Sequence, residues 1–395
     1  MPESTLSAYL TDRLPQYLDD LRLLSGIDSG SYDKPGVDRV QDWLATRFAA
    51  LGFTIETKQQ ARFGNDLLAR RNGSGHRRIL LLGHADTVYP EGTAAERPMA
   101  IDGDKILGPG TCDMKAGILA GIYAVQALDD QNWNELEELT FIIVSDEEIS
   151  ERHSVELLQD EGPRFDAILT LEAARENGDI VTSRKAGTWM TVEVHGKSAH
   201  AGVEPEKGIS ATVALGQILV DTFKLNAMKH GMTVNPGDIE GGRAPNIVAD
   251  YARGHFDLRA WTNNELAELS EAFVRVCRQA ESSGVSVSIS ADSGTGTPSM
   301  ERNDGVKQLE AAAIAIAGEI GFPLRGAATG GGSDISFAGY RGNPGLDGLG
   351  PIGGLDHGPD EYIRMSSIVP RTELLARLIQ RIGDDERLAY EQRRS

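Results

Sequence analysis

Histidine and acidic side chains follow several apolar segments of this sequence at the point where each segment ends. His84 and Asp86 come directly after the apolar run 79–83. An imidazole binds metal ions, and a nearby carboxylate can hold its second ring nitrogen and fix the tautomer. A lone histidine at a strand end more often has a structural role or is merely exposed. The pair therefore indicates a metal site only if further ligands join it.

Further acids occupy equivalent positions later in the chain. Glu147 and Glu148 end a run of three acids after the apolar segment 139–145, and Glu172 follows the segment 167–171. Three consecutive acids also suit a solvated loop. Ligand sites of open parallel sheets lie at the carboxyl ends of the strands. Three segments that each end in metal-binding side chains therefore favour one shared metal site.

Asp113 lies in the glycine-containing segment 105–117, just before an apolar stretch that runs to about residue 128. We expect this stretch to be a buried helix. A carboxylate at the start of a helix is favoured as an N-cap, so an N-cap and a metal ligand both remain open for Asp113. Cys112 beside it could act as a nucleophile, but no second motif supports that role, and we interpret it as a packed small residue.

The elements that would position these residues indicate an α/β fold. The three apolar runs are typical of strands buried on both faces. Apolar residues at helical spacing predict helices over residues 6–24, 37–51, 306–320 and 369–382. We expect a mixed, mostly parallel sheet with helices on both faces.

The pattern changes near residue 181 and returns to the α/β pattern after residue 295. Between these points we expect strands at 188–194, 246–261 and 285–290, and helices at 209–223 and 265–280. Two helices against one antiparallel sheet suit an α+β, ferredoxin-like insert. We therefore expect one domain of residues 1–181 and 295–395, interrupted by a second of residues 182–294.

Composition excludes several classes of protein. A chain of 395 residues is too long for one ordinary core. Its net charge of −20 argues against a nucleic-acid partner. Cys112 and Cys277 are too few for a disulfide framework, which fits a reducing compartment. The N-terminus lacks the pattern of a signal peptide, and no apolar run reaches membrane-spanning length. We expect a cytoplasmic protein with no membrane partner.

A last candidate, His357, stands in the loop 355–359. With it, the order and spacing of the candidate residues resemble the di-zinc family of glutamate carboxypeptidase, aminoacylase, acetylornithine deacetylase and succinyl-diaminopimelate desuccinylase. The resemblance covers nearly the whole chain and implies a zinc-peptidase-like catalytic domain with a dimerising lid. It also implies two Zn²⁺ per chain, with Co²⁺ or Mn²⁺ as alternatives. Mixed imidazole and carboxylate ligands suit such ions better than calcium.

The resemblance further implies a role for each ligand. Asp113 would bridge the two ions, His84 and Glu172 would complete one site, and Glu148 and His357 the other. The remaining histidines, except one in the insert, match no motif, and we interpret them as ordinary.

Three other residues receive catalytic roles from the same resemblance. Glu147, adjacent to a ligand but not itself one, would be the general base. Asp86 would orient the imidazole of His84. His200, in the loop 196–202, would steady the oxyanion from the lid, often from that of the partner subunit. The alternative for His200 is an ordinary surface histidine.

The implied substrate contacts lie in or near the insert. Asn246 and Arg259 would bind a substrate carboxylate, and the backbone N–H groups of Gly331 and Gly332 could assist. A structural salt bridge at Arg259 and a plain turn at the glycines are the alternatives. Relatives that release glutamate commonly carry an arginine where this chain has Thr297. This difference argues against glutamate as the released amino acid.

The resemblance thus implies a metallo-carboxypeptidase or N-acyl-amino-acid amidohydrolase that acts next to a free carboxylate, as a homodimer formed through the lid. An aminopeptidase of the same family is the nearest alternative. A non-catalytic metal-binding scaffold is disfavoured, because Glu147 has no structural need to be a glutamate.

Overall fold

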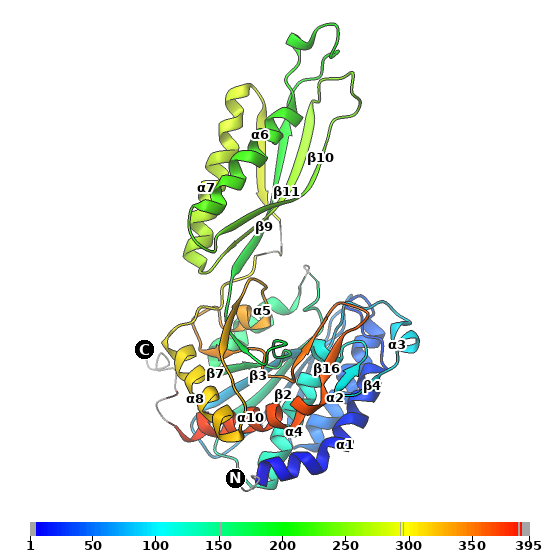
Figure 1. The fold of residues 1–395 in the computed structure, drawn as a ribbon, viewed down its shortest axis with the longest axis vertical. Coiled ribbons are helices and arrows are strands. Elements are labelled where there is room, and N and C mark those ends of the chain that lie inside the picture. The colour runs from blue at the N-terminus through cyan, green and yellow to red at the C-terminus, as the bar shows by residue number, and fades with distance from the viewer. Residues whose placement is uncertain (1–4, 150–151, 293, 295, 386–387, 389–395) are drawn as a thin grey trace. The chain divides into compact units, whose positions relative to one another are not determined.

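The computed structural model describes residues 5–149, 152–292, 294, 296–385 and 388. Its contacts divide the chain into two compact units (Figure 1). Unit 1 comprises Met1–Thr182, Arg302–Ala328 and Ser333–Ser395, and unit 2 comprises Ser183–Glu301 and Thr329–Gly332. The expected domain limits at residues 182 and 294 stay a prediction, and each unit is described by itself.

A six-stranded mixed sheet forms the centre of unit 1. Its strand order is β1 (Thr54–Lys58), β2 (Asp66–Asn72), β6 (Glu138–Val144), β3 (Arg78–His84), β7 (Ala167–Thr170) and β14 (Gly345–Leu346). β3 pairs in parallel with both β6 and β7, and β7 pairs in parallel with β14. β1, β2 and β6 pair antiparallel. The expected mixed, mostly parallel sheet is therefore confirmed.

Helices cover both faces of this sheet. One face shares its hydrophobic core with α1 (Thr5–Ser25), α2 (Lys34–Ala50), α4 (Ala116–Asp130), α8 (Asp304–Ile320) and α10 (Met365–Asp384). Ile79 and Leu81 of β3 point into that core. On the opposite face, α9 (Asp334–Ala338) contacts β3 and β7 and packs against α5 (Ser154–Glu161). This arrangement is the α/β fold that the apolar runs predict.

Short elements complete unit 1. A second sheet has the order β15 (Gly353–Gly354), β16 (Tyr362–Arg364), β5 (Lys105–Leu107) and β4 (Ala100–Asp102). α3 spans Thr93–Glu96. β13 (Gly326–Thr329) pairs with β8 (Ile180–Arg184), and both strands begin in unit 1 and end in unit 2. Strands of two to five residues are too short to show a periodic pattern, so the sequence did not predict these pairings.

Unit 2 has the element order β-α-β-β-α-β that defines a ferredoxin-like fold. The elements are β9 (Ala186–His195), α6 (Ala211–Phe223), β10 (Thr233–Gly241), β11 (Tyr251–Ala260), α7 (Asn263–Gln279) and β12 (Ser286–Ala291). All strand pairs are antiparallel, in the order β10, β11, β9, β12. Both helices lie on one face of the sheet (Figure 1). β10 was not among the predicted strands, because Pro236 and a bulge interrupt its pattern.

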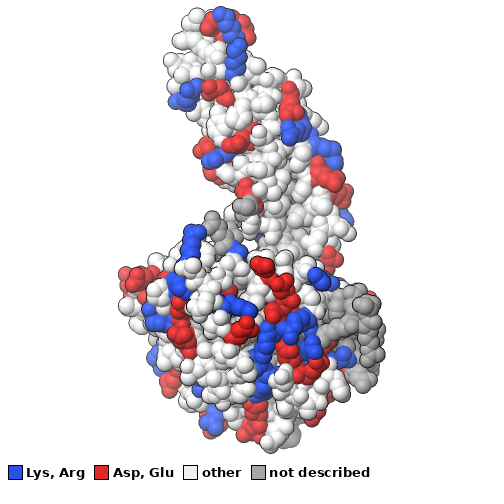
Figure 2. Space-filling model, turned by 180° about the vertical axis from the view of Figure 1, so that it is seen from behind, with Lys and Arg blue, Asp and Glu red and all other residues white. Residues whose placement is uncertain are grey.

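The surface carries charges of both signs. Figure 2 shows Lys and Arg side chains interspersed with Asp and Glu side chains over one face of each unit. Among the residues that the structure describes, no helix combines the length and the apolar character needed to cross a bilayer.

Candidate metal centre

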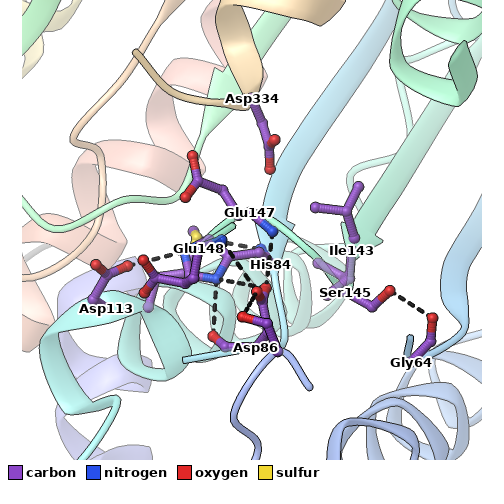
Figure 3. Close-up of polar contacts among 12 residues, drawn as sticks. Gly64, His84, Asp86, Asp113, Ile143, Ser145, Glu147, Glu148 and Asp334 are labelled. Carbon is purple, nitrogen blue, oxygen red and sulfur yellow. Dashed lines mark hydrogen bonds and ion pairs between the residues drawn. The ribbon is translucent and has the colours of Figure 1, made fainter. Parts of the chain in front are cut away.

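Three neighbouring strands of the central sheet bring the candidate ligands together. β3 ends at His84, β6 ends three residues before Glu147, and β7 ends two residues before Glu172. Because β3 runs parallel to both neighbours, these ends lie at one edge of the sheet. Figure 3 shows the side chains of His84, Asp86, Asp113 and Glu148 converging there.

Asp113 presents one carboxylate oxygen to each of two histidines. Its Oδ1 lies 2.9 Å from Nε2 of His84, and its Oδ2 lies 3.1 Å from Nε2 of His357. Asp113 does not cap a helix, because its backbone is non-helical (φ −120°, ψ 97°) and α4 begins only at Ala116. The N-cap alternative is therefore wrong. The carboxylate is instead placed where it can be shared between two ligand sets.

Each histidine has a second acid beside it. Oε1 of Glu172 lies 3.6 Å from Nε2 of His84, and Oε2 of Glu148 lies 3.2 Å from Nε2 of His357. Asp356, which the sequence analysis did not propose, also groups with Asp113 and His357. Two clusters of histidine and carboxylate atoms thus share Asp113, in the grouping that the sequence resemblance implies.

Asp86 contacts both the imidazole of His84 and the backbone of Glu147 and Glu148. Nδ1 of His84 lies 3.3 Å from Oδ1 of Asp86 and 3.0 Å from its backbone oxygen. The carboxylate also accepts hydrogen bonds from the backbone N–H groups of Glu147 (3.2 Å) and Glu148 (3.1 Å). The hydroxyl of Ser31 donates a further bond of 2.6 Å to it. A buried carboxylate with these contacts leaves Nε2 of His84 free to bind an ion.

The electrostatics of the cluster favour positive charge. Desolvation raises the pKa of Glu148 to about 7. Burial and the neighbouring Asp113 raise the pKa of Glu172 well above its usual value. Hydrogen bonds to Asp113 and Glu148 raise the pKa of His357 to about 11. Burial opposes the charging of His84, but its contacts with Asp113 and Asp86 outweigh this and raise its pKa. Without a metal, the cluster therefore draws protons.

The donor set fits divalent metal ions. Oε1 of Glu148 is buried and has no hydrogen-bond partner, so an acceptor is left over for a cation. Ion binding would displace the protons that the crowded carboxylates attract. Imidazole and carboxylate together are ligands that zinc, cobalt and manganese accept.

Glu147 lies beside this cluster and has a different set of neighbours. Nη1 of Arg152 lies 3.7 Å from Oε1 of Glu147, and Arg152 forms an ion pair with the buried Asp334. The Arg152 guanidinium also lies 4.9 Å from the ring centroid of Phe337. Desolvation raises the pKa of Glu147, while Arg152 opposes that shift. Arg152 and Asp334 could not be predicted from the sequence, because no motif links them.

A second cluster of His153, Asp66 and Asp146 anchors the strand end before Glu147. Nε2 of His153 lies 3.1 Å from Asp66, and Nδ1 lies 2.8 Å from Asp146. Burial disfavours the charged imidazole, but these carboxylates raise the pKa of His153 to about 9. With both ring nitrogens facing carboxylates, the protonated imidazole forms ion pairs and has no lone pair for a metal. We therefore interpret this cluster as structural.

The other predicted site residues belong to unit 2. His200 is exposed, and its Nδ1 accepts a hydrogen bond of 3.2 Å from the N–H of Gly202. Asn246 is also exposed, and its backbone oxygen accepts a bond of 3.0 Å from the N–H of Ala201. The loops that carry His200 and Asn246 therefore lie against each other within the unit.

Arg259 and the glycine loop are also in contact within unit 2. Nη1 of Arg259 donates to the backbone oxygen of Gly330 over 2.7 Å. Nη1 of Arg184 donates to the oxygens of Gly331 (3.0 Å) and Gly332 (3.1 Å). Three consecutive carbonyl groups of this loop thus bind guanidinium groups. The contacts show how the loop is held, and an anion-binding role for its N–H groups stays a prediction.

The sheet and its cluster of histidine and carboxylate side chains define an α/β protein with a candidate site for divalent metal ions. The profile of peptidase family M20/M25/M40 matches residues 80–381, and the chain belongs to this family. Carboxypeptidase G2 of Pseudomonas sp. (strain RS-16) is 27% identical over 386 residues, which cover 96% of this chain and 92% of that protein. Acetylornithine deacetylase of Vibrio cholerae serotype O1 is 27% identical over 240 residues, 56% of this chain and 60% of that protein.

Two solved structures have a similar fold. Aminopeptidase PepT from Bacillus cereus ATCC 10987 has a TM-score of 0.81 at 23% identity, covering 94% of this chain and 99% of that one. The M20 family metallo-carboxypeptidase Sso-CP2 from Sulfolobus solfataricus has a TM-score of 0.73 at 17% identity, covering 93% and 99%.

Proposed function

We propose that the protein is a zinc-dependent amidohydrolase that cleaves an N-acyl amino acid or a C-terminal peptide bond next to a free carboxylate. The observation that carries this proposal is the position of Asp113 between His84 and His357, with one oxygen at 2.9 Å and the other at 3.1 Å. A carboxylate in this position would hold two Zn²⁺ ions, with Co²⁺ or Mn²⁺ as alternatives. His84 and Glu172 would complete one site, and Glu148 and His357 the other.

Glu147 would transfer the proton during hydrolysis. Bound dications would lower the pKa of an attacking water and stabilise the charge that develops on the amide oxygen. Glu147 would accept the proton of that water on its carboxylate and pass it to the leaving nitrogen. Desolvation raises the pKa of Glu147, which brings it closer to the neutral value that suits a general base. Asp86 would keep His84 in the tautomer that binds metal.

The substrate class rests on unit 2 and on the relatives. Arg259 and Asn246 would hold the free carboxylate, and His200 would steady the oxyanion. Carboxypeptidase G2, similar over nearly the whole of both chains, favours a carboxylate next to the scissile bond. Thr297 argues against glutamate as the leaving amino acid. Aminopeptidase PepT shares the fold, so an aminopeptidase remains the alternative to be tested.

We further propose a homodimer formed through the lid, with His200 acting in the partner's site. The exposed side of α6 supports this, because Val213, Val220 and Phe223 are 73%, 58% and 59% exposed. Mixed dimers of Glu147→Ala and His200→Ala chains should regain activity, because one of their two sites has both residues. If confirmed mixed dimers stay inactive, His200 acts within its own chain.

The test of the function is a substrate screen. The purified chain should be stripped with a chelator, reloaded with Zn²⁺ and assayed for amine release from N-acyl amino acids, dipeptides and their C-terminal amides. Activity that depends on zinc and on the free carboxylate is expected. A requirement for a free amine would favour the aminopeptidase instead, and no zinc-dependent hydrolysis of any substrate would reject the proposal.

A further inference from the structure

A buried acid outside the ligand set connects the two loops that carry Asp113 and His357. Glu361 follows His357 by four residues, and only 1% of it is exposed. Its Oε2 accepts a hydrogen bond from the backbone N–H of Gly110 at 3.0 Å. Its Oε1 accepts two more, from Cys112 at 2.7 Å and from Asp113 at 3.0 Å.

These three bonds hold the backbone where the helical turn Thr111–Lys115 is interrupted at Asp113 and Met114. Asp113 has non-helical dihedrals, so helix hydrogen bonds do not fix its peptide unit. Bonds from amide N–H groups to an ionised carboxylate are shorter and stronger than neutral ones. Buried N–H groups that lose such an acceptor pay their full desolvation cost. The Glu361 carboxylate is therefore suited to fix the position of Asp113.

The turn that carries His357 is also bound by two side chains, at the residue that follows His357. The hydroxyl of Tyr89 donates to the backbone oxygen of Gly358 over 2.8 Å, and Nη1 of Arg97 donates to the same oxygen over 3.2 Å. The stretch from His357 to Glu361 is thus attached at both ends. Its position and that of Asp113 depend on the same carboxylate.

We propose that Glu361 is a positioning residue that fixes Asp113 relative to His357 and thereby sets the metal affinity of both sites. The inference rests on the proposed metal centre, because it assigns Asp113 and His357 to metal ions. It adds a residue that binds neither metal nor substrate but acts through the backbone of a ligand.

The test compares two glutamate-to-glutamine substitutions in the full-length chain. In Glu361→Gln the side-chain NH₂ has to face an N–H donor, so part of the contact becomes repulsive. Glu310→Gln is the matched control, because Glu310, on α8, is also buried (8% exposed) but forms an ion pair with Arg302, which precedes that helix. Zinc dissociation constants are measured by competition with a chelator. The free energy of unfolding of the metal-free chains is measured in urea.

Both zinc dissociation constants should rise by roughly 10–100-fold in Glu361→Gln, the usual range when a residue that supports a ligand is lost. The zinc dissociation constants of Glu310→Gln should stay at the wild-type values, even though the free energy of unfolding of this variant is also expected to fall. Wild-type zinc affinity in Glu361→Gln would overturn the inference, as would an equal loss of affinity in both variants.

A variant that does not fold is replaced by Glu361→Asp. This side chain keeps the charge but is one methylene too short to reach all three N–H groups, so weaker zinc binding is again expected. Unchanged zinc affinity in this variant would also overturn the inference. If the wild-type chain itself fails to bind two ions, the proposed metal centre is wrong, and that result is distinguishable from a failure of Glu361 alone.

Discussion

Arg259 and Asp257 are joined by two hydrogen bonds of 2.8 Å, from Nε and Nη2 of the guanidinium to the two carboxylate oxygens. The backbone oxygen of Gly330 takes a third N–H group. An arginine has five such groups, so two remain for a ligand. The salt bridge and a substrate contact are therefore compatible, and Asp257 fixes the orientation in which Arg259 would meet a carboxylate.

This arrangement predicts how amidation of the substrate affects hydrolysis. Replacing the free carboxylate by an amide should lower kcat/KM of the wild type by roughly 10–100-fold, the range expected for hydrogen bonds to a charged group. In Arg259→Ala the same replacement should cost much less, because the interaction is already absent. Arg253→Ala on the same strand is the control and should keep the full penalty. Equal penalties in wild type and Arg259→Ala would contradict the contact.

The proposed role of Glu147 predicts a loss of turnover without a loss of metal. Glu147→Gln keeps the size of the side chain but cannot accept the proton, so kcat should fall by roughly 10²–10⁴-fold. Zinc content and melting temperature should stay close to wild type. Glu156→Gln, at an exposed position of α5, is the control and should leave kcat, zinc content and melting temperature unchanged. Loss of zinc in Glu147→Gln would mean that Glu147 is a ligand, and unchanged turnover would mean that it is not the base.

The raised pKa of His153 predicts that the stability of the folded chain depends on pH. Its pKa is raised from 6.5 to about 9 in the folded chain, so the folded state binds the proton more tightly than the unfolded state. This contribution to stability is fully present below the unfolded pKa and is lost as the pH rises through the folded pKa.

The free energy of unfolding of metal-free His153→Gln should therefore fall furthest below that of wild type at pH 6. The difference should shrink by pH 10, as urea titrations at a series of pH values would show. A difference that does not change with pH would mean that His153 is not charged in the folded state.

The strand ends of the central sheet of unit 1 could be predicted from the sequence, because strands buried on both faces are continuous apolar runs. The runs before His84 and Glu172 end where the structure ends β3 and β7, to within one residue. The family resemblance, carried by the spacing of the acids and histidines, assigns Asp113, His84 and His357 to one site. The structure brings these side chains together, and their roles as metal ligands stay a prediction. Both predictions depend on features that are local in sequence or specific in spacing.

Other contacts leave no such pattern. Glu361 acts through backbone N–H groups about 250 residues away in sequence, and an acceptor for N–H groups needs no partner of a particular residue type. The ion pair of Arg152 with Asp334 likewise joins two residues that are far apart in sequence and that only tertiary packing brings together. β10 was missed because its proline and glycine are typical of turns.

The central claim is that Asp113 is shared by two metal ions, and metal analysis of four purified chains after loading with Zn²⁺ tests it most directly. The account predicts about two ions per chain in the wild type and in His230→Ala, an exposed control histidine in unit 2. It predicts about one ion in His357→Ala and none in Asp113→Ala. A wild-type chain that holds a single ion, or an Asp113→Ala chain that keeps both, would contradict the account.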